Sequence, residues 1–244
     1  MATPLLAIEK LTAGYGRGEV LRGVDLSIEP GSVTCVIGPN GAGKSTVLKT
    51  ISGLLRPTHG AISLRGESIA GLSPQAVLDR GVVHVPQERS LFPSMTVWDN
   101  LLMGAFVLRD RTLVRDRAEA VAERFAIVRE RRHAHAGSLS GGEQKLVEIA
   151  RAMMLDPELL LMDEPSMGLD PKARHLVFTT IAKINEEGRT VLLVEQNARS
   201  GLAIAGHGAV MESGVVRLTG SGQSLLSNPE VARLYLGTAG ALRK

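Results

Sequence analysis

A glycine-rich loop between a short β-branched run and an amphipathic run is the feature that most constrains the fold of this chain. The loop fits the pattern G-x-x-x-x-G-K-[S/T] at Gly38, Gly43, Lys44 and Ser45. Residues 32–37, before the loop, are typical of a buried strand. Apolar residues after the loop recur at helical spacing, at Val47, Leu48, Ile51, Leu54 and Leu55. Gly53 lies near the expected end of this helix. The sequence therefore predicts a strand, a tight loop and a helix in direct succession.

A unit of this kind forms a cradle for a phosphate group. Glycines let backbone N–H groups turn inward around an anion, and the helix N-terminus adds partial positive charge. Lys44 would reach the outer phosphates of a nucleoside triphosphate, and Ser45 would offer its hydroxyl to Mg²⁺. A glycine-rich turn that contains Lys and Ser by chance is the alternative, and the flanking elements argue against it. The candidate phosphate-binding residues are Gly38, Pro39, Asn40, Gly41, Ala42, Gly43, Lys44, Ser45 and Thr46.

Composition narrows the class of protein. The 244 residues suffice for one large α/β domain or one domain with an insertion. The net charge of +3 is too weak to indicate nucleic-acid binding, and 3% aromatic residues argue against a base-stacking surface. No apolar run approaches the ~18 residues of a membrane-spanning helix. The apolar run near the N-terminus is too short for a signal peptide. The single cysteine, Cys35, excludes an internal disulfide, fits a reducing compartment and is expected to be a core thiol.

The remaining patterns predict an α/β fold with a helical insertion. Charges interleave with Ala, Leu and Val from about residue 97 to 132, which predicts helices with exposed charged faces. A final helix is expected to begin at Asn228-Pro229 and to stop at Gly237. Strand patterns occur at residues 6–11, 20–28, 60–67, 81–87, 159–162, 190–194, 209–211 and 215–218.

The strand at residues 159–162 ends in two adjacent carboxylates, Asp163 and Glu164. In a chain with a phosphate loop, this pair suggests a division of labour. Asp163 would hold Mg²⁺ directly or through water, and Glu164 would polarise the attacking water. The strand at residues 190–194 is followed by Glu195 and Gln196.

Residues 139–144, Leu-Ser-Gly-Gly-Glu-Gln, open another helix. Ser140 fits an N-cap, and Glu143 lies three residues later as in a capping box. This local role is a complete structural explanation of the pattern. The same geometry would also present backbone N–H groups to an anion such as a γ-phosphate, so both interpretations stay open. The apolar residues expected on the buried side of this helix are Leu146, Val147, Ile149, Ala150, Met153 and Met154.

Together these motifs resemble the ATP-binding subunits of ABC transporters, over almost the whole chain. Residues 139–144 are similar to the LSGGQ-type signature of that family and lie between the phosphate loop and the acidic strand, in the family's order. The resemblance implies that Ser140, Gly141 and Gly142 bind nucleotide. It also implies that Asp163 and Glu164 are the Walker B aspartate and the catalytic glutamate.

Three further positions take roles from this resemblance. Tyr15 matches the aromatic residue that stacks on adenine, although a half-buried loop tyrosine explains it equally well from local sequence. Gln87 matches the glutamine that senses Mg²⁺ and the transporter interface, and Asp170 matches the aspartate of the D-loop. The implied cofactors are ATP and Mg²⁺, with Ser45, Gln87 and Asp163 around the metal.

One position departs from the family pattern. Gln196 stands where the family usually carries a histidine that contacts the γ-phosphate, and glutamine can hydrogen-bond but cannot carry a positive charge. The run at residues 194–198, Val-Glu-Gln-Asn-Ala, is nevertheless similar to the LivF type, which serves importers of branched-chain amino acids. Gln196 is therefore predicted to act with Glu164 in catalysis as a trait of that subfamily. Urea-import ATPases look similar in this region.

The resemblance also implies an architecture, a P-loop NTPase core of ABC type. This is a mixed sheet with helices, an N-terminal antiparallel β subdomain and an inserted helical subdomain. Residues 1–244 would form one domain, with a core at 1–90 and 156–220, a helical subdomain at 91–155 and a helical tail at 221–244.

The same resemblance implies partners. The signature of one subunit would face the phosphate loop of a second ATP-binding subunit, expected to be a different chain, with a homodimer as the alternative. Transmembrane permease subunits would contact the surface near Gln87 and residues 91–93, which places the chain at the cytoplasmic face of the inner membrane as a peripheral protein. No direct nucleic-acid partner is expected.

Two rival classes are weaker. ABC-type ATPases that act on DNA usually carry long coiled-coil insertions, and residues 87–140 leave room only for a compact helical insertion. A P-loop kinase or GTPase does not account for the signature or for the acidic pair. A guanine-reading N-K-x-D run is also absent, because Asn185 is followed by Glu186 and Asn197 by Ala198.

Overall fold

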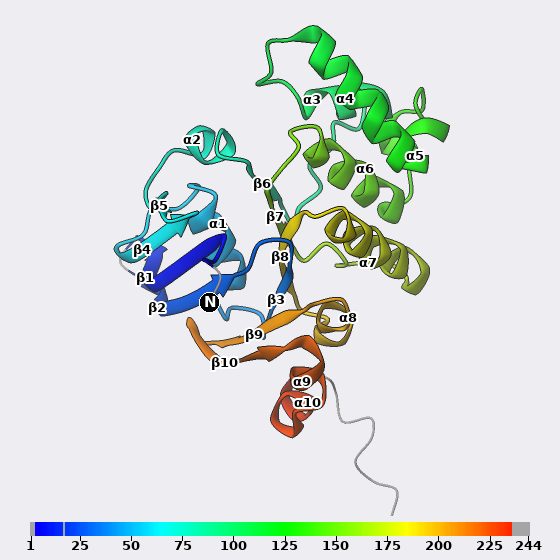
Figure 1. Ribbon diagram of the computed structural model, residues 1–244. Helices are drawn as coiled ribbons and strands as arrows, with labels where there is room; N and C mark the ends of the chain where they lie inside the picture. The colour runs from blue at the N-terminus through cyan, green and yellow to red at the C-terminus, as the bar shows by residue number, and fades with distance from the viewer. Residues whose placement is uncertain (1–2, 17, 236–244) are drawn as a thin grey trace, which may run out of the picture.

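The computed structural model describes residues 3–16 and 18–235. Two sheets organise this part of the chain (Figure 1). The larger sheet has the strand order β10-β9-β3-β8-β7-β6, and the smaller one has the order β2-β1-β4-β5. This mixed sheet, with helices and a separate antiparallel sheet, is the predicted α/β architecture.

The larger sheet is parallel from β6 to β9, and its central strands are covered on both faces. Every residue of β3 (Val33–Ile37), β7 (Leu159–Asp163) and β8 (Thr190–Glu195) is buried, which explains their continuous apolar runs. β6 (Val82–Val85) pairs with β7 at one edge. β9 (His207–Glu212) and the antiparallel β10 (Val215–Ser221) form the predicted hairpin at the other edge.

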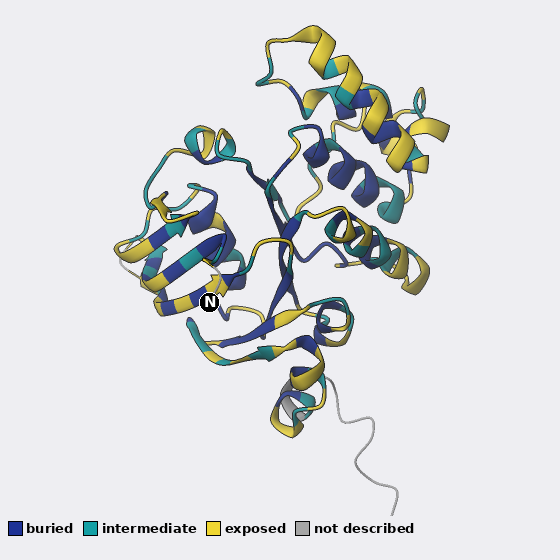
Figure 2. Cartoon of the chain, viewed as in Figure 1, coloured by how far each residue is buried: buried dark blue, intermediate teal, exposed yellow. Residues whose placement is uncertain are grey.

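The smaller sheet is antiparallel and built mostly from the N-terminal segment. β1 (Leu6–Tyr15) pairs with β2 (Gly18–Ile28) and with β4 (His59–Leu64), and β4 pairs with β5 (Glu67–Ser68). Buried and exposed residues alternate along much of β2 (Figure 2), as expected for a strand with one buried face. The predicted N-terminal antiparallel sheet is therefore present.

Helix α1 (Lys44–Ile51) follows the glycine loop, as predicted, but it is shorter than the apolar spacing suggested. Leu54 and Leu55 lie beyond its end, and Leu54 is exposed. The chain leaves the helix at Gly53, whose φ of 75° is left-handed and ends regular helical hydrogen bonding. The expected helix end near Gly53 is therefore confirmed, whereas the inclusion of Leu54 and Leu55 in the helical face was wrong.

The predicted helical insertion consists of α3 (Val97–Met103), α4 (Arg111–Arg124), α5 (Ala126–Glu130), a 3₁₀ turn (Ala136–Ser138) and α6 (Gly141–Met153). These helices lie together to one side of the larger sheet (Figure 1). The short helix α2 (Pro74–Leu78) precedes β6, and Ser73 caps it as expected. The exact domain limits given above stay a prediction.

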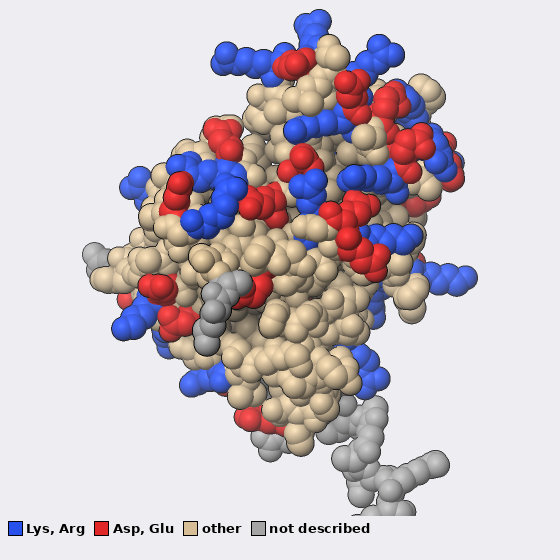
Figure 3. Space-filling model, viewed as in Figure 1, with Lys and Arg blue, Asp and Glu red and all other residues tan. Residues whose placement is uncertain are grey.

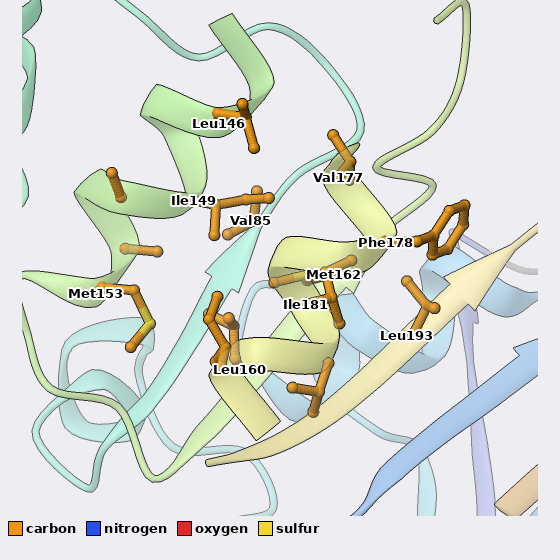
Figure 4. Packing of buried hydrophobic residues seen from close by; sticks show 14 of the residues in the cluster. Val85, Leu146, Ile149, Met153, Leu160, Met162, Val177, Phe178, Ile181 and Leu193 are labelled. Carbon is orange, nitrogen blue, oxygen red and sulfur yellow. The ribbon is translucent and has the colours of Figure 1, made fainter. Parts of the chain in front are cut away.

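The core has two parts, one on each face of the larger sheet. One lies between this sheet and the antiparallel sheet, and includes Leu48 and Ile51 of α1. In the other, α6 and α7 (Pro171–Glu186) pack on β6, β7 and β8 (Figure 4). All six α6 residues predicted to face inward are buried there, and Cys35 belongs to the same cluster. Burial of the Cys35 thiol, more than the nearby Glu195 charge, raises its pKa well above the ordinary value, as expected of a core thiol.

The C-terminal segment forms α8 (Ala198–Ala203), α9 (Gly222–Leu226) and α10 (Pro229–Tyr235). α10 begins where the Asn228-Pro229 pair predicts, whereas the expected stop at Gly237 lies outside the described residues. In the part of the chain that the structure describes, no helix has both the length and the apolar character needed to cross a membrane.

Candidate functional site

A pocket of about 310 Å³ opens where β3, β7 and β8 end. Its lining residues come from β2, the glycine loop, the first turn of α1 and the segments after β6, β7 and β8. They are Val20, Asn40, Gly41, Gly43, Lys44, Ser45, Thr46, Gln87, Glu164, Met167 and Gln196. The strand order joins residues that lie more than 100 positions apart, and the carboxyl ends of parallel strands are where α/β folds bind ligands.

The glycine loop has a backbone that side chains would disturb. Gly43 caps α1 with a φ of 100°, in the left-handed region, and α1 has no side-chain cap. A Cβ on Gly38 would lie 2.3 Å from the carbonyl oxygen of Met211. The loop is therefore held against β9, and its backbone N–H groups at the start of α1 are left for an anion.

Lys44 is buried at the base of the loop, 4% exposed. Its Nζ donates hydrogen bonds to the carbonyl oxygens of Gly38 and Pro39, at 3.0 and 3.2 Å. The same atom lies 3.3 Å from Oε1 of Glu164. Lys44 also lines the pocket, so its amino group stands beside the space that the loop encloses.

Ser45 and Asp163 meet at the other side of the loop. The Ser45 hydroxyl donates to Oδ1 of Asp163 at 2.9 Å. Burial is the largest influence on the Asp163 carboxyl and raises its pKa, while the Ser45 hydrogen bond opposes the rise. A hydroxyl and a carboxylate are oxygen donors that suit Mg²⁺, which commonly takes its other ligands from water and phosphate. The donor set at this point fits a magnesium ion.

Glu164 has an unusual backbone for a residue other than glycine, with φ of 45°. Its N–H donates to the carbonyl oxygen of Val194 at 2.9 Å, which fixes the turn after β7 to β8. The Gln87 amide approaches Oε2 of Glu164 at 3.5 Å. Strained backbone held by the surrounding structure is frequent at functional sites.

The other predicted site residues are placed differently. Gln196 is exposed and lines the pocket. Gln87 also lines it, but the amide contacts Glu164 and the Met167 sulfur rather than Ser45 or Asp163. Tyr15 ends β1 and is 52% exposed, outside the lining of this pocket.

The Leu139–Gln144 segment also lies outside this pocket, at the N-terminal end of α6, where Ser140 is exposed, residues 141–144 are half-buried and Leu139 is buried. Both capping-box bonds are present: Glu143 N–H donates to the Ser140 hydroxyl at 3.4 Å, and Ser140 N–H donates to Glu143 Oε2 at 2.7 Å. A Cβ on Gly142 would lie 2.5 Å from Cβ of Ala173, whereas Gly141 has room for one. Asp170 caps α7 through the N–H groups of Lys172 and Ala173. Helix capping and close packing therefore account for part of the sequence pattern at residues 139–144 and for Asp170.

A polar cluster that the sequence did not predict holds the segment after Gln87. The Glu148 carboxylate accepts the Ser90 N–H at 2.6 Å, and Arg151 donates to the Ser90 carbonyl oxygen at 2.7 Å. Lys145 pairs with Glu148 at 2.5 Å. The available signal was the spacing of Lys145, Glu148 and Arg151 by three residues along one face of an otherwise apolar helix.

Comparison with known proteins agrees with this geometry. The family described as "ABC transporter" matches residues 21–167. The branched-chain amino acid transport ATP-binding protein BraG of Pseudomonas aeruginosa is 39% identical over 96% of this chain and 100% of its own length. The chain belongs to the ABC transporter family. As a member of this family it binds nucleotide, and its ATP hydrolysis is coupled to transport.

Other ABC proteins match over nearly the full chain as well. LivG of Escherichia coli K12 is 34% identical over 98% of this chain and all of its own. A nucleotide-free ATP-binding cassette from an ABC transporter superposes with a TM-score of 0.86 at 30% identity, covering 96% of this chain and 100% of that one. The ADP conformation of an ABC cassette gives 0.85 at 30% identity, covering 97% and 100%. The ABC fold and nucleotide binding predicted from the sequence are confirmed.

Proposed function

We propose that this chain is the ATP-hydrolysing subunit of an importer for branched-chain amino acids. The observation that carries the cargo assignment is that BraG, LivG and the probable LivF of Archaeoglobus fulgidus, 36% identical over 96% of this chain, are all branched-chain amino acid transport ATP-binding proteins. The match covers at least 99% of each of these relatives.

The site supports a division of labour in hydrolysis. The loop N–H groups and Lys44 bind the β- and γ-phosphates, and Ser45 and Asp163 hold Mg²⁺. A Mg²⁺ ion held by these two residues would neutralise charge that develops on the phosphates. Glu164 accepts the proton of the attacking water and first exchanges its contact with Lys44 for one with that water. Gln196, exposed at the pocket edge, orients the same water or the γ-phosphate by hydrogen bonding.

A second ATP-binding subunit would complete the site. Ser140, Gly141 and Gly142 lie outside the pocket of their own chain, at the N-terminus of α6, where Ser140 is exposed and the two glycines are half-buried. Support for a dimer comes from a related cassette whose structure is dimeric in a post-hydrolysis state with ADP and phosphate. That cassette is 26% identical, with a TM-score of 0.78 over 88% of this chain and 98% of its own. A partner's nucleotide would then meet the N–H groups of α6, and Tyr15 would stack on adenine at the opposite rim.

An apolar groove beside the Gln87 segment supports a contact with membrane subunits. It has a volume of about 360 Å³ and includes Phe92, Met103 and Phe106, which are 45%, 38% and 71% exposed. Ser90 and Glu148 form part of its wall, so a permease segment in the groove would touch the structure that holds Gln87. This contact would keep the chain at the cytoplasmic face of the membrane.

The nucleic-acid alternative finds no support on the face shown in Figure 3. Lys and Arg side chains there lie among Asp and Glu side chains, mostly over the helices, rather than in one basic stripe. A surface on which positive and negative charges are interspersed lacks the continuous basic patch that binds the phosphate backbone of a nucleic acid.

Uptake by the source cell tests the proposal. Deletion of the gene is expected to reduce uptake of leucine, isoleucine and valine. The wild-type gene and Glu212→Gln, at an exposed carboxylate of β9, should restore uptake, while Glu164→Gln should not. Loss of urea uptake with normal leucine uptake would overturn the cargo assignment. Normal uptake of every amino acid and of urea would overturn the proposed transport role.

A further inference from the structure

One buried carboxylate joins the two turns that carry Glu164 and Gln196. Glu195, the last residue of β8, is 2% exposed and does not line the pocket. Its Oε1 accepts the backbone N–H of Ser166 at 3.1 Å, and its Oε2 accepts that of Asn197 at 3.3 Å. Ser166 lies in the turn after β7, and Asn197 lies in the turn after β8.

Each turn presents a site residue close to its anchored N–H group. Glu164 is two residues before Ser166, and Gln196 is one residue before Asn197. Both site residues line the pocket. The distance between them therefore depends on a bridge that runs through one side chain, in addition to the bond from Glu164 N–H to the Val194 carbonyl oxygen.

We propose that Glu195 is a positioning residue, which holds Glu164 and Gln196 at a fixed separation during hydrolysis. This inference rests on the roles proposed above for those two residues. It assigns no contact between Glu195 and the nucleotide, because the residue lies behind the pocket lining.

The bridge requires both carboxylate oxygens to be acceptors. Each faces a backbone N–H, so an amide or a protonated acid would turn one donor group toward another donor. The ionised form is costly at this site. Among the ion pairs found at residues 3–16 and 18–232, none includes Glu195. A buried carboxylate that has hydrogen-bond donors but no cationic partner in this part of the chain indicates that a specific geometry is being maintained.

The surroundings make this bridge sensitive to acid. The titratable groups that face Glu195 are the Glu164 carboxylate after β7 and the Cys35 thiol of β3. α8 packs against it with Gly201, and Arg199, the charged residue of α8, is exposed. Burial raises the pKa of Glu195 above the ordinary glutamate value, and its hydrogen bonds from Ser166 and Asn197 only partly oppose this. The ionised bridge is therefore lost as the pH falls through a pKa higher than that of an ordinary glutamate.

The test compares Glu195→Gln with Glu212→Gln, which removes an exposed carboxylate of β9. The full chain, together with any ATP-binding chain that copurifies with it, is assayed for ATP hydrolysis across pH and for ATP affinity, and the unfolding midpoint of the purified chain is measured. Glu195→Gln is expected to lower kcat by about 100-fold, the typical cost of a misplacement near 1 Å, with KM little changed. The acid limb of the pH profile should shift to lower pH in this variant. Glu212→Gln should match the wild type in every measurement.

Glu195→Asp is a second test of the positioning role, for use if Glu195→Gln does not fold. It keeps the charge but is one methylene too short to reach both N–H groups, so kcat should fall while an acid limb remains. A lowered unfolding midpoint with normal kcat and a normal acid limb would overturn the positioning role. Glu164→Gln is assayed in parallel: if it hydrolyses ATP normally, the proposed catalytic assignment fails, whatever Glu195 does.

Discussion

The N-terminus of α6 offers two explanations of one residue, and paired substitutions separate them. Ser140 caps the helix, and it is also the residue proposed to meet the γ-phosphate of a partner's nucleotide. Glu143 completes the same capping box but is assigned no role in nucleotide binding. Ser140→Ala removes both functions, whereas Glu143→Ala removes only the cap.

The structure sets the expected loss of stability. Each substitution deletes one of the two reciprocal bonds, Glu143 N–H to the Ser140 hydroxyl or Ser140 N–H to the Glu143 carboxylate. The loss of an N-cap costs about 1 kcal/mol. For a domain of this size, that lowers the unfolding midpoint by about 2–4 °C. The double variant should lose less than the sum, because the two bonds belong to one network.

The cap also carries a pH signature. The Ser140 backbone N–H, then its hydroxyl, lowers the pKa of the Glu143 carboxyl below the ordinary value. A depressed pKa in the folded state gives stability that is present above the unfolded pKa and is lost as the pH falls through the folded pKa. The difference in midpoint between the wild type and Glu143→Ala should therefore narrow in acid.

ATP hydrolysis by the assembled subunits distinguishes the two explanations. A hydrogen bond to a charged group contributes about 1.5–3 kcal/mol, so its loss should lower turnover by about 10- to 100-fold in Ser140→Ala. Glu143→Ala should retain nearly all of its turnover. Equal turnover in the two variants would refute the nucleotide contact, and an unchanged unfolding midpoint in Glu143→Ala would refute the capping argument.

Three further variants test other parts of the site. Glu164→Gln should bind ATP but hydrolyse it about 10²- to 10⁴-fold more slowly, as measured by phosphate release; normal release would exclude Glu164 as the base. Lys44→Met should abolish ATP binding and, because Glu164 would lose its buried partner, lower the free energy of unfolding by about 3 kcal/mol in urea titration; tight ATP binding would contradict this. Gly142→Ala should lower the unfolding midpoint more than Gly141→Ala, because only the former brings a Cβ against Ala173; equal midpoints would contradict the packing.

Local sequence patterns predicted the strands that are buried along their whole length and the helix that is buried along one face. The apolar strands that became β3, β7 and β8 are buried at every residue, and the inward face of α6 followed its helical period. The same rule failed after Ile51, because a left-handed Gly53 ends the helix before Leu54. The spacing of apolar residues alone does not reveal where the backbone leaves the helical conformation.

Only the part of the site that is continuous in sequence could be predicted from a motif. The phosphate loop is continuous in sequence, so its residues could be named from one motif, whereas Lys44 and Glu164 are joined only by the strand order. The acidic pair at the end of its strand and the resemblance to ABC proteins both predicted that Glu164 acts at the nucleotide, but neither predicted its contact with Lys44. Glu195 escaped prediction because its carboxylate turns inward to backbone N–H groups, which carry no mark in the sequence.

The mass in solution of Glu164→Gln tests the central claim, a nucleotide site completed by a second ATP-binding subunit. The variant is measured with and without Mg-ATP, alone and with any ATP-binding chain that copurifies with it, and Lys44→Met serves as the control that cannot bind ATP. We expect ATP to join two ATP-binding chains, while Lys44→Met stays at the mass of one chain. A variant saturated with ATP that remains at the mass of one chain in both mixtures would contradict it.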